Sequence, residues 1–201
     1  MSLENRLKEY PKPAEYARSY FGYLSDIFSK IDTTQIAKFI ETILDARERG
    51  ARIFFIGNGG SAATASHFAN DLSVGTRSKG KPFKVMSLTD NAAVITAIGN
   101  DFGYEFIFQK QLQSLMQEGD VVVAISASGN SPNLVTAIEY ANQMKATTVA
   151  LTGFDGGKLL QKATFAVHVP SNKGEYGPVE DLHMIFDHIV YTYICNLIKN
   201  S

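Results

Sequence analysis

Three serines lie close together in segment 126–131, whose sequence Ser-Ala-Ser-Gly-Asn-Ser follows an apolar stretch and precedes a helical pattern. Hydroxyl and backbone N–H groups at a helix N-terminus can surround a phosphate without a lysine, through neutral hydrogen bonds and the helix dipole. A serine-rich helix cap would use the same residues. The segment lacks the Gly-Lys-Ser/Thr sequence of a nucleotide-binding P-loop. It therefore predicts either a phosphate site of another kind or a cap.

A second loop of this kind is segment 56–61, Ile-Gly-Asn-Gly-Gly-Ser, which also joins an apolar stretch to a helical pattern. Its glycines allow close approach of a ligand to the backbone. A loose dinucleotide fingerprint begins at Gly57, but the first acid that closes the next strand is Asp90, thirty-three residues later instead of about twenty. A structural tight turn is the other alternative. Two such loops on parallel strands favour a phosphorylated ligand.

Composition limits the class of protein. The 201 residues are 45% hydrophobic and 19% charged, which suits one globular domain. Nineteen Lys and Arg against twenty Asp and Glu give a net charge of -1, so no overall basic field attracts nucleic acid or an anionic membrane. The single cysteine, Cys195, excludes an internal disulfide. The charged start does not resemble a secretory signal, and polar residues interrupt the longest uncharged run, so we expect a cytoplasmic protein without a membrane span.

Hydrophobic periodicity predicts the elements that must position these loops. Helical spacing covers residues 13–29 and a second helix that is capped by Thr33 or Thr34 and stopped by Gly50. Beyond Gly50, short apolar runs alternate with helical stretches, which is typical of a parallel, doubly wound α/β sheet. The expected strands are 52–56, 83–88, 120–126, 147–152 and 164–169, and the expected helices lie near 60–73, 91–99, 103–116, 132–144 and 178–199.

Four motifs in this order and spacing resemble the sugar isomerase (SIS) domain family, and more narrowly its phosphoheptose isomerases. They are segments 57–61, 100–103, 126–131 and 151–158. The resemblance implies a five-stranded, flavodoxin-like αβα sandwich at 51–201 with a helical N-terminal extension at 1–50. It implies a homotetramer with sites between subunits. The implied reaction interconverts sedoheptulose 7-phosphate and D-glycero-D-manno-heptose 7-phosphate, for heptose synthesis in lipopolysaccharide or capsule.

The same resemblance assigns substrate-binding residues. It assigns phosphate binding to the three serines of segment 126–131. The family often has threonine at the position of Ala127. Other positions are expected around the rest of the sugar. The full implied set is Asn58, Gly59, Gly60, Ser61, Asn100, Asp101, Ser126, Ser128, Ser131 and Glu180.

Histidine and carboxylate positions implied by the family fall on two helices. His67 and Asp71 are four residues apart, so both project from one helix face, although a surface ion pair commonly has this spacing. Asp71 stands where the family usually has glutamate. Glu180, where glutamine is common, and His188 are about 12 Å apart along a helix, with faces about 80° apart. The resemblance implies Asp71 and His188 as the acid/base pair and Zn²⁺ held among His67, Asp71, Glu180 and His188.

Two further histidines have ordinary structural interpretations, and the same motifs also fit other functions. His183 and Asp187, at i and i+4, are interpreted as a helix-surface pair, and His168 lies in a strand with no catalytic part expected. Alternatives are an isomerase for another sugar phosphate and a non-catalytic SIS adaptor tetramer that binds a replication initiator. A sugar-phosphate-sensing regulator would carry a DNA-binding module, and the first fifty residues show no basic stripe.

Overall fold

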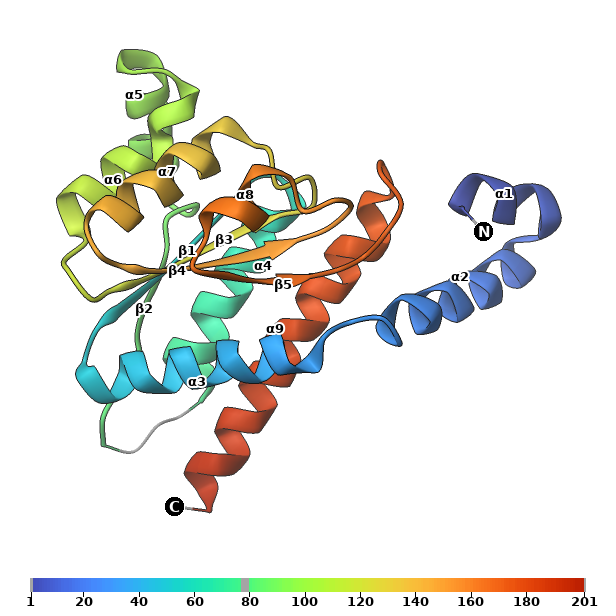
Figure 1. Cartoon of the computed structure of the whole chain (residues 1–201), viewed down its shortest axis with the longest axis horizontal. Helices are drawn as coiled ribbons and strands as arrows, with labels where there is room; N and C mark the ends of the chain where they lie inside the picture. The colour runs from blue at the N-terminus through green and yellow to red at the C-terminus, as the bar shows by residue number, and fades with distance from the viewer. Residues whose placement is uncertain (1, 77–79, 201) are drawn as a thin grey trace.

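A parallel five-stranded sheet forms the centre of the molecule (Figure 1). The computed structural model describes residues 2–76 and 80–200. Its strands run in the order β2-β1-β3-β4-β5, the doubly wound flavodoxin-like arrangement that the sequence predicts. The strands are β1 (Arg52–Gly57), β2 (Lys84–Ser87), β3 (Val121–Ser126), β4 (Thr147–Thr152) and β5 (Phe165–His168).

Alternate residues of the central strands point into two separate hydrophobic cores. Phe55 and Val123 face one core, whereas Phe54 and Val122 face the other, and all four are fully buried. The first core is covered by α3 (Thr33–Arg49), α4 (Gly60–Asn70) and α9 (Tyr176–Lys199). The second is covered by α6 (Ile107–Leu115), α7 (Pro132–Gln143) and α8 (Gly157–Lys162). Burial on both faces explains why the strands read as continuous apolar runs.

The N-terminal helices α1 (Leu3–Glu9) and α2 (Pro13–Phe28) extend away from the sheet toward one end of the molecule (Figure 1). Hydrogen bonds tie α2 to the start of α9. The Tyr20 hydroxyl donates to Asp181 Oδ2 over 2.5 Å, and the Tyr23 hydroxyl donates to the buried Glu175. The helical extension therefore helps to fix the N-terminal end of α9.

Two details differ from the sequence prediction. Asp32 caps α3, not Thr33 or Thr34: its Oδ1 accepts the Thr34 N–H over 2.9 Å. A carboxylate is an equally good N-cap, so sequence preference did not separate the candidates. Gly50 ends the helix in the left-handed region, as predicted. The helices α1 and α8 are additional to those predicted, because six or seven residues carry too little periodicity to detect.

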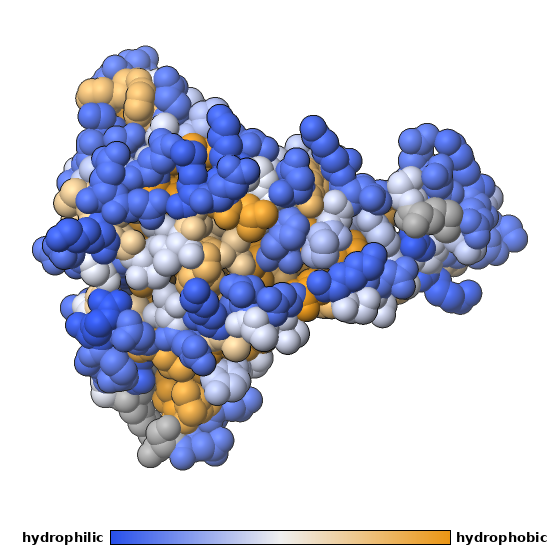
Figure 2. Space-filling model, viewed as in Figure 1, coloured by the Kyte–Doolittle hydropathy of each residue, from blue (hydrophilic) through white to orange (hydrophobic). Residues whose placement is uncertain are grey.

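An apolar helix with no buried residue lies at another end of the molecule. This helix, α5 (Ala92–Asp101), carries orange apolar surface in Figure 2. A 3-10 turn at Tyr104–Phe106 connects it to α6. Within the described part of the chain, no helix combines the length and apolar character needed to cross a membrane.

Candidate functional site

The two predicted loops lie side by side, because β1 and β3 are neighbours in the sheet. This is the point where the strand order reverses, at which doubly wound folds bind ligands. Between the loops lies a small pocket of about 170 Å³, which we call the serine pocket. It is lined by Asn58, Ser61, Ile125, Ser126, Ala127, Ser128, Ser131, Leu134, Tyr176 and Glu180.

Serine hydroxyls in this pocket differ in how they are held. Ser126 Oγ accepts the Gly129 N–H over 3.1 Å, and Ser128 Oγ accepts the Asn130 N–H over 3.3 Å. Ser131 is the N-cap residue of α7, yet its side chain makes no capping hydrogen bond. The ordinary reason for a serine at this position is therefore absent, and its hydroxyl is available to a ligand.

Glycine is required where the serine pocket is tightest. A Cβ on Gly60 would lie 2.4 Å from Glu180 Oε2, and one on Gly129 would lie 1.9 Å from the Gly156 carbonyl oxygen. Glu180 on α9 therefore lies directly against the first turn of α4, beside Ser61. The loops that follow β3 and β4 touch backbone to backbone.

Asn58 belongs to a small amide network. Its Nδ2 donates to Asn133 Oδ1 over 2.9 Å, and its Oδ1 accepts from Asn133 Nδ2 and from the Tyr104 hydroxyl. Asn133 is almost fully buried. Sequence reasoning missed Asn133, whose only signal is a polar residue on the face of α7 that packs on the sheet. The network fixes the glycine loop against the helix that follows the serines.

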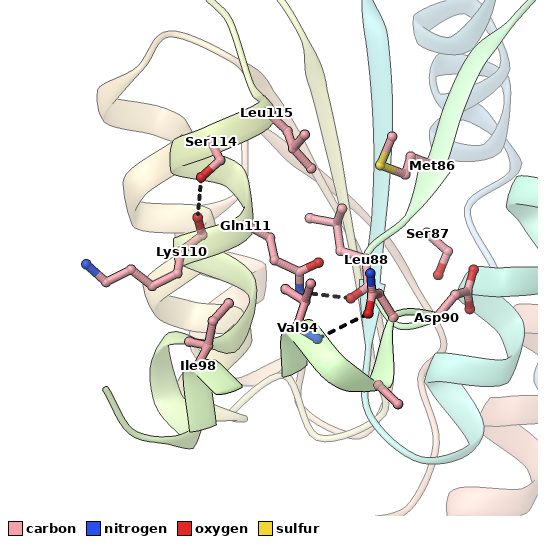
Figure 3. A pocket seen from close by; sticks show the side chains of 12 residues that line it. Met86, Ser87, Leu88, Asp90, Val94, Ile98, Lys110, Gln111, Ser114 and Leu115 are labelled. Carbon is pink, nitrogen blue, oxygen red and sulfur yellow. Dashed lines mark hydrogen bonds between the residues drawn. The ribbon is translucent and has the colours of Figure 1, made fainter. Parts of the chain in front are cut away.

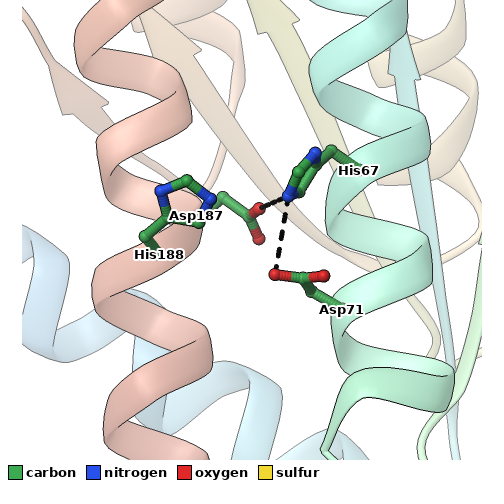
Figure 4. A group of neighbouring side chains, drawn as sticks. All are labelled: His67, Asp71, Asp187 and His188. Carbon is green, nitrogen blue, oxygen red and sulfur yellow. Dashed lines mark ion pairs between the residues drawn. The ribbon is translucent and has the colours of Figure 1, made fainter.

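A second group of side chains lies farther along α4 and α9 (Figure 4). His67, Asp71, Asp187 and His188 form this group, which we call the His/Asp cluster, and one ligand atom from each lies within 4.8 Å of the others. His67 Nε2 is 3.6 Å from Asp71 Oδ2 and 3.5 Å from Asp187 Oδ2. Asp71 begins a π-helical turn, Asp71–Gly75, a distortion frequent at functional sites.

Asp187 is the unusual member of the cluster. It is fully buried, and neither of its carboxylate oxygens has a hydrogen-bond partner within the described part of the chain. Burial, and then the charge of Asp71, raise the pKa of Asp187 from 3.8 to about 8. Two imidazoles and two carboxylates are ligands that Zn²⁺ takes in proteins, so the donor set fits this metal. The sequence offered one signal for Asp187, its place beside His188.

Other predicted residues lie elsewhere. The structure brings His67, Asp71 and His188 together but places Glu180 in the serine pocket, outside the His/Asp cluster. Asn100 and Asp101 lie at the exposed end of α5, where the Asn100 amide donates to Asp101 Oδ1 over 2.9 Å.

The prediction that His183 lies on the helix surface is wrong. His183 is fully buried, and its Nε2 faces the Thr152 carbonyl oxygen over 3.4 Å. Burial lowers its pKa to about 4. His168 contacts the Thr152 hydroxyl through Nδ1 over 3.1 Å. Both histidines contact Thr152 at the end of β4, His168 from β5 and His183 from α9, and neither joins the His/Asp cluster.

A larger groove of about 660 Å³ lies between the edge strand β2 and the helices α5 and α6 (Figure 3). Its lining is mostly apolar, with Gln111 Nε2 donating to the Leu88 carbonyl oxygen over 3.0 Å. None of the predicted site residues lines it. Size alone therefore does not identify the ligand site in this fold.

Known proteins share both the sequence and the fold. Residues 15–153 match the SIS domain family. The chain is 36% identical over 186 residues to the phosphoheptose isomerase of Aliarcobacter butzleri, covering 92% of this chain and 95% of that protein. For the Akkermansia muciniphila phosphoheptose isomerase, identity is 37% over 194 residues, with 94% and 97% covered. The solved phosphoheptose isomerase of Neisseria gonorrhoeae matches with a TM-score of 0.82 and 30% identity, covering 94% of this chain and 100% of that chain. This chain therefore belongs to the SIS domain family and, within it, to the phosphoheptose isomerases.

Proposed function

We propose that this protein interconverts sedoheptulose 7-phosphate and D-glycero-D-manno-heptose 7-phosphate. One observation carries the proposal: α4 and α9 each join the serine pocket to the His/Asp cluster. Seven residues separate Glu180 from Asp187, which places the cluster roughly 10 Å along the helix from the pocket. A sugar phosphate with its phosphate at one end and its carbonyl at the other has this extended form.

Aldose–ketose isomerisation needs a base that removes a proton beside the carbonyl and an acid that protonates the carbonyl oxygen as an enediol forms. Asp71 and His188 are our candidates, with the direction of transfer between them open. Ser126, Ser128 and Ser131 are the candidates for binding phosphate through neutral donors. Holding the phosphate away from the reacting carbons fixes the substrate without neutralising the acid or the base.

His67, Asp71 and His188 would hold a Zn²⁺ ion together with a further carboxylate. When bound, such an ion supplies Lewis acidity that polarises the oxygens of the sugar. The side chains of the cluster orient the substrate carbons between α4 and α9. The buried wall that Asp187 and its neighbours provide excludes water from one side of this space.

A homotetramer with sites between subunits is part of the proposal. The serine pocket, at about 170 Å³, is smaller than typical ligand pockets, which supports a site completed by another subunit. The apolar helix α5 and the groove beside it offer surface for such contacts. The exposed Asn100 and Asp101 on α5 would then reach the substrate of a neighbouring subunit.

We further propose a cytoplasmic role in supplying heptose for lipopolysaccharide or capsule. The test is a panel of ketose and aldose phosphates, incubated with the purified protein with and without added zinc, and followed for isomer formation. Faster conversion of the heptose phosphates than of pentose and hexose phosphates supports the proposal. Activity on a different sugar phosphate changes the substrate, and no activity on any, with capture of a replication initiator, assigns an adaptor.

A further inference from the structure

An ionised carboxylate at the buried position of Asp187 needs an electrostatic partner. It lies at 0% exposure, and among residues 2–76 and 80–200 neither of its oxygens has a hydrogen-bond partner, a costly state for an ionised group. Among the described histidines and acids, those whose ligand atoms group with it are His67, Asp71 and His188. A second carboxylate, Asp71, makes the local charge more negative.

The distances around His67 are too long for ordinary hydrogen bonds to explain why it lies between the carboxylates of Asp71 and Asp187. Its Nε2 is 3.5 Å from Asp187 Oδ2 and 3.6 Å from Asp71 Oδ2, which is too long for a hydrogen bond. A single N–H that is shared between two carboxylates at these distances makes only a weak interaction with each. Ligand atoms around a tetrahedral zinc ion, about 2.0–2.1 Å from the metal, lie about 3.3–3.4 Å from one another. The two distances from His67 Nε2 are close to this value, and all four ligand atoms lie within 4.8 Å of one another.

We propose that Asp187, in place of Glu180, is the fourth ligand of a divalent metal ion held by His67, Asp71 and His188. Glu180 lies outside the His/Asp cluster, because its carboxylate is placed against Gly60 at the serine pocket. The inference rests on the proposed function for the use of the metal in isomerisation, but not for its binding. On α9 it assigns Asp187 to the metal and Glu180 to the substrate.

Metal binding without substrate tests this assignment. Wild-type protein, Asp187→Asn and Glu180→Gln are stripped with a chelator and titrated with Zn²⁺ against a chromophoric competitor. We expect one ion per subunit for wild type and about 100-fold or greater loss of affinity for Asp187→Asn, since even outer partners of metal ligands contribute 10–100-fold. Glu180→Gln should retain wild-type affinity. The same ranking should appear in the rise of melting temperature on adding Zn²⁺.

A cysteine at the ligand position gives a positive signal. Cobalt-loaded Asp187→Cys should show a thiolate-to-metal charge-transfer absorption, and cobalt-loaded Glu180→Cys should look like wild type, which has the lone Cys195. Circular dichroism and sedimentation check that each variant is folded. The absorption in Glu180→Cys but not in Asp187→Cys overturns the proposal, as does wild-type zinc affinity in folded Asp187→Asn.

The outcomes separate this inference from the proposed function. Zinc affinity that depends on Asp187, in a protein that isomerises no sugar phosphate, leaves the metal assignment standing and removes the enzyme. If the protein isomerises heptose phosphate but Asp187→Asn leaves its zinc affinity unchanged, the enzyme stands and the metal assignment is removed.

Discussion

His67 Nε2 on α4 lies 3.5 Å from Asp187 Oδ2 on α9, in a cluster that neither helix could form alone. His67 is 42% exposed at its side chain, whereas Asp187 is fully buried. The cluster thus joins the protein interior to the surface between the two helices. Because the same helices begin at the serine pocket, a change in their spacing would alter both phosphate binding and proton transfer.

Asp71→Asn and His188→Asn are each expected to lower turnover about 100-fold or more, because each removes a group proposed to move a proton. Substrate affinity should persist, since the phosphate is held by the serines. Steady-state kinetics, with sedimentation to confirm the assembly, measure both effects. Asp71→Glu is the control that keeps a carboxylate and restores the longer acid of the family. Near-normal turnover in either asparagine variant would remove that residue from the reaction.

Ser131→Ala is expected to raise the Michaelis constant for the phosphorylated sugar about tenfold, the loss of one hydrogen bond to a charged group. Stability should change little, because the Ser131 side chain makes no capping hydrogen bond. Ser128→Ala should act in the same direction, and Ser29→Ala, at the exposed end of α2, is the matched control. An unchanged Michaelis constant with a lower melting temperature would show that Ser131 is a helix cap only.

The protein is expected to lose stability in acid because the buried His183 resists protonation. Its pKa is about 4 in the folded protein, against about 6.5 in the unfolded chain. The unfolded state therefore binds a proton that the folded state refuses, and this contribution is complete above pH 6.5 and lost as the pH falls toward 4. The loss amounts to about 3 kcal/mol at most. Urea unfolding of wild type and His183→Asn at pH 7 and pH 4.5 should show the smaller decrease in the variant. Equal decreases would contradict it.

A tetramer is the expected assembly. We expect another copy of the chain to bury α5 and the groove beside it, and each subunit has a mass of 22.0 kDa. Sedimentation equilibrium at micromolar concentration should give four times this mass. Ile98→Glu, on the half-buried face of α5 that lines the groove, should shift the protein toward smaller species. A wild-type monomer would be incompatible with shared sites.

Local patterns in the sequence predicted the sheet and the loops, because strand periodicity and glycine-serine turns act over a few residues. The parallel order of the sheet and the SIS family are confirmed. His67 and Asp71 could be paired from their spacing on one helix. Asp187 could not, because its partners lie on another helix and only tertiary contact selects it over Glu180. The prediction for His183 was wrong for a related reason, because the spacing of His183 and Asp187 on a helix does not say whether their face is buried.

The most direct test is the rate at which the wild-type protein converts sedoheptulose 7-phosphate, measured with Asp71→Asn and His188→Asn in parallel. The account predicts that wild type forms the aldose heptose phosphate. Turnover in both folded variants should be lower than in wild type by about 100-fold or more. Absence of conversion by folded wild type, with and without added zinc, would contradict it, as would equal rates in all three proteins.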